Sequence, residues 1–397
     1  MDYDLIVVKT LERVYKNYYY IIRGKKENLL GVSVQKQFIQ SIANTVGTDF
    51  TKYKIVKKGQ FTYIPDTSRR GDKIAIALLE DYEEGLVSNV YTVFEVIDTE
   101  KLLPEYLMLW FSRPEFDRYA RFKSHGSVRE VMDWEEMCKV ELPVPDIEKQ
   151  RKIVKAYKTI TDRIALKQKI NDNLVACIDT IFNEQFGNFK ALAESSTANT
   201  DFSSLPDGWT IENAVHSFDI SIGKTPPRSE PEWFTSNQTD NVWISIADMK
   251  TNSPFIFKSA EYLTNEAVKK HNVKIVPANS VLLSFKMTVG RVAIVTNEVT
   301  TNEAIAHFPC TKENLFFVYC YLKNFNYGYL GSTSSITTAI NSKIIKEMPF
   351  LMPSKKELDL FNHKVSGLFE QLKYISKELD ILEELSKMLL PQLLGHC

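Results

Sequence analysis

Residues 358–382 read LDLFNHKVSGLFEQLKYISKELDIL, and this stretch decides the fold. Apolar residues recur in it at alternating intervals of three and four, and Lys and Glu fill many of the positions between them. That heptad pattern is typical of a long helix that packs along a second helix. The residues that form the predicted seam are Leu358, Phe361, Val365, Leu368, Leu372, Ile375, Leu379 and Leu382.

A second long helix is predicted near the middle of the chain. Its apolar stripe comes in two pieces, and the phase slips between Ile164 and Ile170, which predicts a stutter. The two pieces are Ile153, Tyr157, Ile160, Ile164 and then Ile170, Leu174, Ile178, Ile181. Each helix of roughly 40 residues would be about 60 Å long at 1.5 Å per residue.

A single amphipathic helix of that length cannot bury its own stripe. Either each helix packs on its own globular part, or the two helices pair with each other. We expect the second arrangement, antiparallel, because a whole globular segment separates the two helices and lets the chain return.

The rest of the chain contains one sequence pattern twice. A single offset aligns three positions of the middle segment with three positions near the end: Ser127 with Ser335, Asp133 with Asn341, and Pro145 with Pro353. Upstream, the stretch Lys54-Ile-Val56 before Gly59 resembles Lys274-Ile-Val276 before Asn279. A repeat of this length indicates a duplicated domain, because solenoid repeats have periods of about 20–50 residues.

The sequence therefore predicts an α+β protein. Two mixed α/β globular domains would be joined by two long helices that form an antiparallel coiled coil. The predicted boundaries are a first domain at 1–145, a first helix at 146–190, a linker at 191–204, a second domain at 205–353 and a second helix at 354–397.

Composition sets broad limits on the class of protein. The 397 residues are 44% hydrophobic, which is ample for buried cores, and the formal net charge is −1. This charge does not indicate a nucleic-acid binder, but a large protein can gather its cations on one face. Five scattered cysteines make no disulfide framework. With no secretory signal and no apolar run of about 20 residues, we expect a cytoplasmic protein that does not contact a membrane.

The motifs of catalysis are missing from the sequence. The closest match to a phosphate-binding loop, Gly223-Lys-Thr225, lacks the upstream glycine and is followed by Pro226-Pro227, which would block the helix that such a loop feeds. Cys and His do not occur in pairs at zinc spacing, and no methyltransferase box is present. We therefore expect no catalytic residue, no metal and no cofactor in this chain.

Cations, hydroxyls and aromatic residues gather in loops of both predicted domains. Lys and Arg neutralise phosphates, Arg and Lys also read base edges, and Ser and Thr fix register on the DNA backbone. Any one of these residues could be an ordinary surface charge, but their presence in both domains favours DNA. The candidate DNA-binding residues are Lys58, Tyr63, Arg69, Arg70, Lys73, Arg121, Lys123, His125, Ser127 and Arg129 in the first domain, and Lys224, Thr225, Arg228, Lys286, Thr288, Arg291, Ser334, Ser335 and Thr337 in the second.

Several segments, in this order along the chain, resemble the specificity subunits of type I restriction–modification systems. The segments are Gly59-Gln-Phe61, Leu142-Pro-Val-Pro-Asp146 leading to Gln150-Arg151, Leu205-Pro-Asp-Gly-Trp209, Gly223-Lys-Thr-Pro226 and Leu389-Leu-Pro-Gln-Leu393. The resemblance covers nearly the whole chain, and its specificity lies in the order of the segments. The first domain lacks the Gly-Lys-Thr-Pro turn, so contacts inferred from that turn do not carry over to it.

The resemblance implies a function in a larger complex. Each domain would read one half of a split, asymmetric double-stranded DNA target, and the paired helices would set the gap between the halves. The helices would also dock two methyltransferase subunits, through which the restriction and translocase subunits attach. The methylation cofactor, ATP and magnesium would belong to those partners.

Two other functions fit the same sequence. The chain could be the recognition part of a fused restriction–methylation enzyme, or a nuclease with an unfamiliar core, and either would show methylation or cleavage by this chain alone. It could also be a coiled-coil assembly adaptor whose domains bind protein. In that case the complete complex would select no DNA sequence.

Overall fold

The computed structural model of the protein describes residues 5–7, 11–13, 29–41, 48–67, 71–126, 130–194, 205–250, 253–330 and 340–394. The chain forms two compact units. The first comprises residues 1–163 together with 383–397, and the second comprises residues 164–382. None of the helices within the described ranges is both long and apolar enough to span a membrane.

The first unit is built around an antiparallel sheet with strand order β2-β9-β6-β7. Its strands are β1 (Leu5–Val7), β2 (Leu11–Arg13), β3 (Leu30–Val32), β4 (Phe38–Gln40), β5 (Lys54–Lys57), β6 (Phe61–Ile64), β7 (Ala75–Leu78), β8 (Glu84–Val87), β9 (Thr92–Val96) and β10 (Glu141–Pro143). Its short helices are α1 (Pro104–Phe111), α2 (Pro114–Lys123) and α3 (Trp134–Met137).

Both faces of this central sheet are covered. On one face the rings of Phe61 and Phe94 stack with centroids 4.8 Å apart, and Phe111 of α1 meets Phe61 edge to face at 5.9 Å. On the other face Val32 of β3 packs with Ala77 in a small buried cluster. Because both faces are covered, every residue of β6 and β7 is buried, including Thr62, and β7 reads Ala-Ile-Ala-Leu with no polar position.

The second unit contains two larger sheets, with strand orders β12-β20-β17-β18-β15 and β13-β16-β14-β19, and a two-stranded sheet of β11 and β21. Its strands are β11 (Thr210–Asn213), β12 (Ser221–Ile222), β13 (Phe234–Thr235), β14 (Asn241–Ile244), β15 (Phe255–Ile256), β16 (Glu261–Leu263), β17 (Ser280–Ser284), β18 (Val292–Val295), β19 (Thr300–Thr301), β20 (Ile305–Pro309) and β21 (Pro349–Met352). Its short helices are α5 (Ala214–Ser217), α6 (Asn265–Lys270), α7 (Leu315–Asn324) and α8 (Ser342–Glu347).

The duplication predicted from the sequence is visible in the backbone. An antiparallel strand pair joins the beginning and the end of each globular part, β1 with β10 and β11 with β21. In each unit a tyrosine hydroxyl donates a hydrogen bond to the first or last residue of the closing strand, Tyr106 to the carbonyl of Pro143 (2.9 Å) and Tyr321 to that of Pro349 (3.0 Å).

Two further pairs of aligned residues have matching local roles. Asp133 accepts a backbone hydrogen bond at the start of α3, and Asn341 does the same at the start of α8, so both act as helix N-caps. Gly59 and Asn279, just before β6 and β17, both have a left-handed backbone, with φ of 84° and 62°. Glycine and asparagine are the residues that adopt this conformation most readily.

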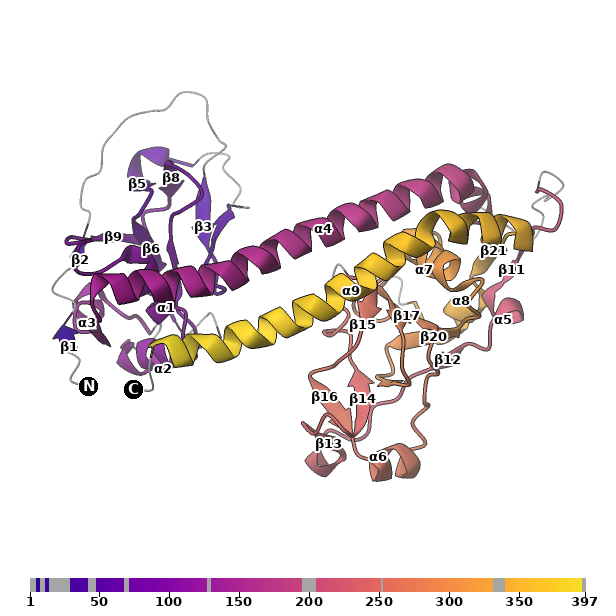
Figure 1. The fold of residues 1–397 in the computed structure, drawn as a ribbon. Coiled ribbons are helices and arrows are strands. Elements are labelled where there is room, and N and C mark those ends of the chain that lie inside the picture. Colours follow the sequence, from indigo (N-terminus) through magenta and orange to yellow (C-terminus); the bar gives the residue numbers. More distant parts are fainter. Residues whose placement is uncertain are drawn as a thin grey trace. The chain divides into compact units, whose positions relative to one another are not determined.

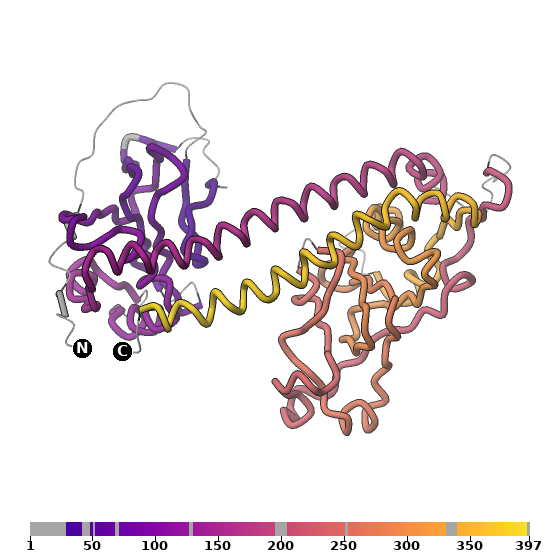
Figure 2. The backbone as a smooth tube through the Cα atoms, in the orientation of Figure 1, coloured from indigo at the N-terminus to yellow at the C-terminus, as the bar shows by residue number. Residues whose placement is uncertain are grey.

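The two long helices are α4 (Ile147–Glu194) and α9 (Lys355–Leu394), the longest elements of the chain (Figure 1). In the second unit Gln185 donates a hydrogen bond to Glu357 (3.0 Å), and Lys167 pairs with Glu378 (2.7 Å), so the helices run antiparallel. In the first unit Ser386 donates to the hydroxyl of Tyr157 (3.3 Å). The course of both helices can be followed in Figure 2.

The helices pair with each other and also pack on the globular parts. In the second unit the ring of Phe186 in α4 contacts Phe361 of α9 and Phe317 of α7, with centroids 5.3 and 4.9 Å apart. In the first unit Ile153 of α4 and Leu390 of α9 belong to the same buried cluster as the central sheet. The fold class expected from the sequence is confirmed, and the two arrangements considered for the helices occur together.

The predicted stutter in the first helix is wrong. Ile170 is exposed, whereas Lys167 and Asn171 occupy the seam between Ile164 and Leu174, and Asn171 is only 3% exposed. The heptad phase therefore continues without a slip, through two polar residues that an apolar pattern cannot reveal.

The second helix differs from its prediction at two seam positions. Leu368 and Leu379 are only partly buried, whereas Phe369, next to Leu368, is fully buried.

The two long helices were expected at residues 146–190 and 354–397. The first helix runs past the expected end at residue 190 to Glu194, so the first four residues of the expected linker are helical. The rest of that linker, residues 195–204, lies outside the described residues. The second helix begins at Lys355 and is described as far as Leu394.

Candidate nucleic-acid interface

The turn at residues 223–228 in the second unit is fastened by backbone hydrogen bonds. The amide of Gly223 donates to the carbonyl of Ile305 (3.1 Å), and that of Lys224 donates to the carbonyl of Thr301 (2.9 Å). A Cβ atom at Gly223 would overlap the backbone oxygen of Asn302, so only glycine allows this close approach. The turn is therefore held against the sheet, with the Lys224 side chain exposed.

Arg228 is the last residue of this turn, and its guanidinium contacts one carboxylate and two aromatic rings. Its Nη1 and Nη2 atoms donate to the two carboxylate oxygens of Glu261, at 2.7 and 2.9 Å. Its guanidinium carbon lies 4.0 Å from the ring centroid of Phe234 and 4.8 Å from that of Trp243. The hydrogen bonds from Arg228 lower the pKa of the Glu261 carboxyl, and the same bonds raise the pKa of the guanidinium.

A second element of the site is the tip between β17 and β18, residues 285–291. Buried Ser284 stabilises this tip. The Ser284 hydroxyl donates a hydrogen bond to the carbonyl of Thr288 (2.6 Å) and accepts one from the amide of Arg291 (3.0 Å). Met287, at the tip, is 98% exposed and has a left-handed backbone with φ of 58°. Lys286 is also exposed, while the Arg291 side chain donates to the carbonyl of Ile246 (2.6 Å).

Glu303 connects the turn with the hairpin tip. The hydroxyl of Thr225 donates to its carboxylate. Burial acts to raise the pKa of Glu303, but the hydrogen bond from Thr225, a backbone hydrogen bond and the positive charges of Lys286 and Arg228 together outweigh it, so the pKa is lowered. The structure therefore brings three predicted residues, Thr225, Arg228 and Lys286, around one carboxylate that the sequence did not single out.

In the first unit a comparable surface forms where two loops meet the end of α2. Arg121 pairs with Asp72 (2.7 Å) and also with Glu130. The hydroxyl of Thr67 donates to that of Ser124 (2.9 Å), and the backbone of His125 pairs with that of Val131. Lys73 is exposed beside Asp72. Lys73, Arg121 and His125 are thus brought into one region.

Two predicted residues of the first unit do not join this region. Lys58 precedes β6, at the end of that strand opposite to the Asp72 loop, and pairs with Glu83 (3.0 Å). Tyr63 is completely buried beside Phe94, with ring centroids 6.0 Å apart. The prediction that Tyr63 contacts DNA is therefore wrong, since the side chain belongs to the core of the unit.

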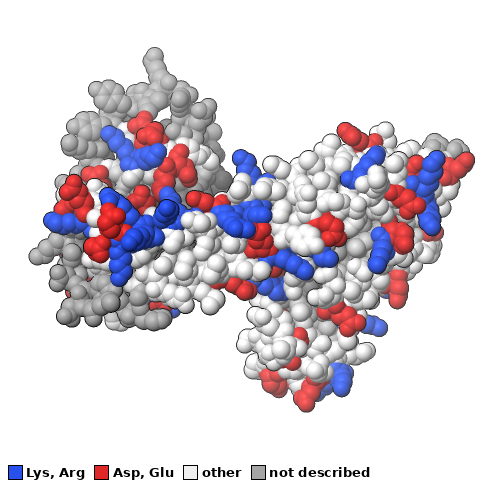
Figure 3. Space-filling model, viewed as in Figure 1, with Lys and Arg blue, Asp and Glu red and all other residues white. Residues whose placement is uncertain are grey.

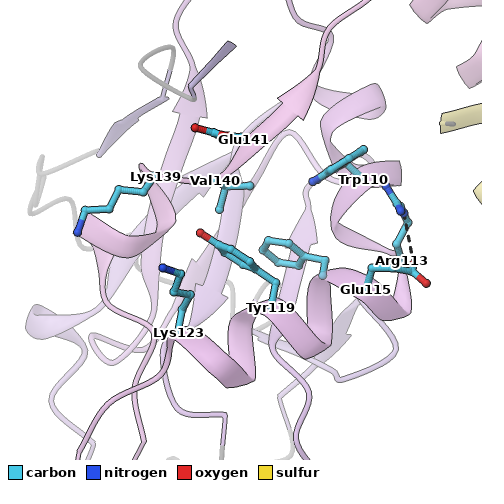
Figure 4. Close-up of a pocket in the computed structure, with 9 residues that line it drawn as sticks. Trp110, Arg113, Glu115, Tyr119, Lys123, Lys139, Val140 and Glu141 are labelled. Carbon is cyan, nitrogen blue, oxygen red and sulfur yellow. Dashed lines mark hydrogen bonds and ion pairs between the residues drawn. The ribbon is translucent and has the colours of Figure 1, made fainter. Parts of the chain in front are cut away.

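Lys123 lines a hollow of about 470 Å³ on the first unit, shown in Figure 4. The hollow lies between α1, α2 and the start of β10, and its walls are aromatic and charged. Its cations have carboxylate partners: Lys123 and Lys139 approach Glu136 at 3.9 and 2.5 Å, and Arg113 pairs with Glu115 at 3.3 Å. This arrangement leaves little uncompensated positive charge in the hollow.

Seven candidate residues lie outside the described residues. They are Arg69, Arg70, Ser127, Arg129, Ser334, Ser335 and Thr337.

Carboxylates accompany the cations over much of the surface. Figure 3 shows Lys and Arg lying side by side with Asp and Glu on the visible face. Sequence reasoning selected the cations and missed the acids that pair with them, namely Asp72, Glu130 and Glu261, as well as Glu303, which accepts a hydrogen bond from Thr225. Such pairs bring together residues that are distant along the chain, and no local motif marks them. Across the described part of the chain, no three His, Cys, Asp or Glu side chains lie close enough together to hold a metal ion.

The chain matches one protein-family model twice. The model is described as the type I restriction modification DNA specificity domain, and it covers residues 6–176 and 217–387. Each match contains most of one globular part and much of the long helix that follows it.

Curated relatives have the same description. The chain is 24% identical to the type I restriction enzyme HindI specificity subunit of Haemophilus influenzae, with 86% of this chain and 87% of that protein covered. It is 23% identical to the type I restriction enzyme MjaIX specificity subunit of Methanocaldococcus jannaschii, over 75% of this chain and 70% of that protein.

A solved structure supports the fold. The S subunit of a type I restriction–modification system from M. genitalium superposes with a TM-score of 0.51 at 14% identity. The match covers 87% of this chain and 85% of that one. At this identity the likeness concerns the fold.

Proposed function

The chain belongs to the type I restriction modification DNA specificity family and is a non-catalytic specificity subunit with two recognition domains, and from this premise we propose how it divides the work of recognition. Each domain reads one half of a split, asymmetric DNA target. In the second domain the reading surface is formed by the turn at 223–228 and the tip at 285–291. In the first domain it is formed by the loops around Arg121.

The observation that carries this proposal is the duplication with unlike loops. Both units share the closing strand pair and the capped helix before the long helix. Their β6–β7 and β17–β18 connections differ in length and composition, and the Gly-Lys-Thr-Pro turn occurs in the second unit alone. Equal frameworks with different loops favour two different half-sites, because sequence is read by the side chains that reach the base edges.

The family membership implies a methyltransferase partner, and α9 offers a surface for it. Tyr374 and Ile381, both in the second unit, are 68% and 65% exposed. They lie seven residues apart, so they share one face of the helix. The seam uses other residues, which leaves this apolar face for a partner. We propose that two modification subunits dock on the long helices and that the restriction and translocase subunits attach through them.

The test is to map adenine methylation in genomic DNA of cells that express the cognate modification subunit with and without this chain. We expect a split motif with two unlike halves, which appears only when the chain is present. As a matched pair, Tyr374→Ala should weaken assembly with the modification subunit, while Lys343→Ala on α8 should not. We expect this work to take place in the cytoplasm, with the chromosomal DNA.

A different outcome would favour a different function. Unchanged methylation without the chain, despite proven assembly with the modification subunit, would leave it as an assembly adaptor. Methylation or cleavage by the purified chain alone would point to a fused enzyme or an unfamiliar nuclease.

A further inference from the structure

Arg228 is the cation of the second domain whose position is most completely defined. Its guanidinium rests against the rings of Phe234 and Trp243, and two hydrogen bonds tie it to Glu261. Trp243 is itself fixed, because it is 2% exposed and its Nε1 atom donates to the carbonyl of Lys224 (3.4 Å). Even so, the Arg228 side chain is 52% exposed, so it is held in place and still accessible.

The pairing with Glu261 determines what Arg228 can attract. The pair is close to neutral, and the carboxylate would repel a phosphate brought near it. A cation that serves the DNA backbone gains nothing from such a partner, whereas Lys286 on the neighbouring tip remains an exposed charge. The arrangement around Arg228 therefore favours a contact made through directed hydrogen bonds of the guanidinium over attraction of a phosphate by net charge.

Arg228 retains the donors for such a contact. A guanidinium carries five N–H donors in one plane, and the end-on pairing with Glu261 uses one on Nη1 and one on Nη2. The edge formed by Nε and the second N–H of the neighbouring terminal nitrogen does not take part in that pairing. Two parallel donors of this kind match O6 and N7 of guanine in the major groove, which is the commonest specific contact of arginine with DNA.

We propose that Arg228 reads a guanine in the half-site of the second domain and that Glu261, Phe234 and Trp243 are positioning residues which hold its guanidinium for that contact. This inference rests on the proposed function of the second domain. It adds one base to that proposal and one residue that determines specificity.

The experiment compares three variants of the full chain, each co-expressed with the modification subunit. Arg228→Lys keeps the charge and removes the planar fork. Glu261→Gln keeps the size of the positioning side chain and removes its charge. Arg151→Lys is the matched control, because Arg151 pairs with Glu148 on the surface of α4 in the other unit. Methylation is scored by sequencing at the wild-type motif and at every single-base variant of it.

We expect Arg228→Lys to reduce discrimination at one guanine position by roughly 5- to 150-fold, the range for losing one bidentate contact. The other positions should keep their preference. Glu261→Gln should relax the same position to a smaller extent, and Arg151→Lys should change nothing. A purely structural role for Glu261 would instead lower methylation at all motif positions alike.

Two results would overturn the inference. One is an Arg228→Lys protein that assembles normally and keeps the wild-type motif at every position. The other is a uniform loss of binding with a shallower salt dependence, which would make Arg228 a phosphate contact. If wild-type methylation does not depend on the chain at all, the proposed function fails first, so the two failures can be told apart. Thermal unfolding of each variant identifies any that is misfolded, and Arg228→Gln then serves as a second test.

Discussion

The rings of Phe186 in α4 and Phe361 in α9 meet edge to face, with centroids 5.3 Å apart and planes inclined by 75°. Both side chains are fully buried, and Phe182 and Phe317 complete the cluster. This contact ties the two long helices of the second unit to each other and to α7. It is the point at which the coiled-coil seam becomes part of a globular core.

Removing one of these rings should destabilise the protein. We expect Phe361→Ala to lower the free energy of unfolding by about 3–5 kcal/mol, because it leaves a cavity among rigid rings. Tyr374→Ala, on the exposed side of the same helix, should change it by less than about 0.5 kcal/mol. Urea unfolding measures both. Equal effects of the two substitutions would contradict the assignment of seam and outer face.

Stability should depend on pH through His307. This side chain is buried in β20 between the hydroxyls of Ser221 (2.8 Å to Nδ1) and Thr301 (2.7 Å to Nε2), and burial lowers its pKa to about 4. An unfolded histidine has a pKa of about 6.5, so the unfolded chain binds the proton first. The stabilising contribution is therefore complete above pH 6.5 and declines as the pH falls towards 4.

Urea unfolding at pH 7 and pH 5 tests this effect. The decline should approach about 1.4 kcal/mol for each pH unit within that window. His307→Gln should remove that part of the pH dependence, while His216→Gln, at an exposed histidine, should retain it. An identical slope in wild type and His307→Gln would show that His307 is not the titrating group.

Lys286 should act on DNA through charge alone. Lys286→Ala should weaken binding of the assembled complex to all sequences and reduce the slope of log K against log salt by about 0.9, the value for one phosphate contact. The methylated motif should stay the same. Filter binding or anisotropy at several salt concentrations measures the slope, and a changed motif would instead make Lys286 a base-reading residue.

Replacing either of two glycines by alanine should have opposite effects: one substitution should harm the protein and the other should stabilise it. Gly223→Ala should displace the turn that carries Thr225 and abolish methylation, because its Cβ would overlap backbone atoms of residues 301 and 302. Gly367 lies in α9, and apart from its chain neighbours and the backbone of its own helix no atom lies within 4 Å of the position of a new Cβ. Gly367→Ala should therefore raise the free energy of unfolding by about 0.5–1 kcal/mol. Methylation sequencing and urea unfolding check the pair, and full activity of Gly223→Ala would refute the role of the turn.

The gap between the half-sites should follow helix length. Lys167 and Glu378 face each other across the seam, so seven residues inserted after each position preserve the heptad phase. The insertion adds about 10 Å to each helix, which corresponds to about three base pairs of DNA. We expect the spacer of the methylated motif to lengthen accordingly. An unchanged spacer would contradict the proposal that the helices set it.

The sequence alone determined the features that depend on local periodicity and on repetition. The heptad in residues 358–382 predicted α9, and the aligned Asp133 and Asn341 proved to be equivalent helix caps. These features follow from the neighbours of each residue along the chain, since helix geometry places every third or fourth side chain on one face and a cap acts within one turn.

Only the tertiary structure decided which side chains hold one another. Arg228 meets Glu261 because β13 pairs with β16, and that pairing joins segments separated by about 30 residues. Tyr63 faces the core, and Asn171 occupies the seam where an apolar pattern selected Ile170 instead. A polar or aromatic side chain suits a surface or an interior equally well in sequence, and its place is settled by the packing of distant segments around it.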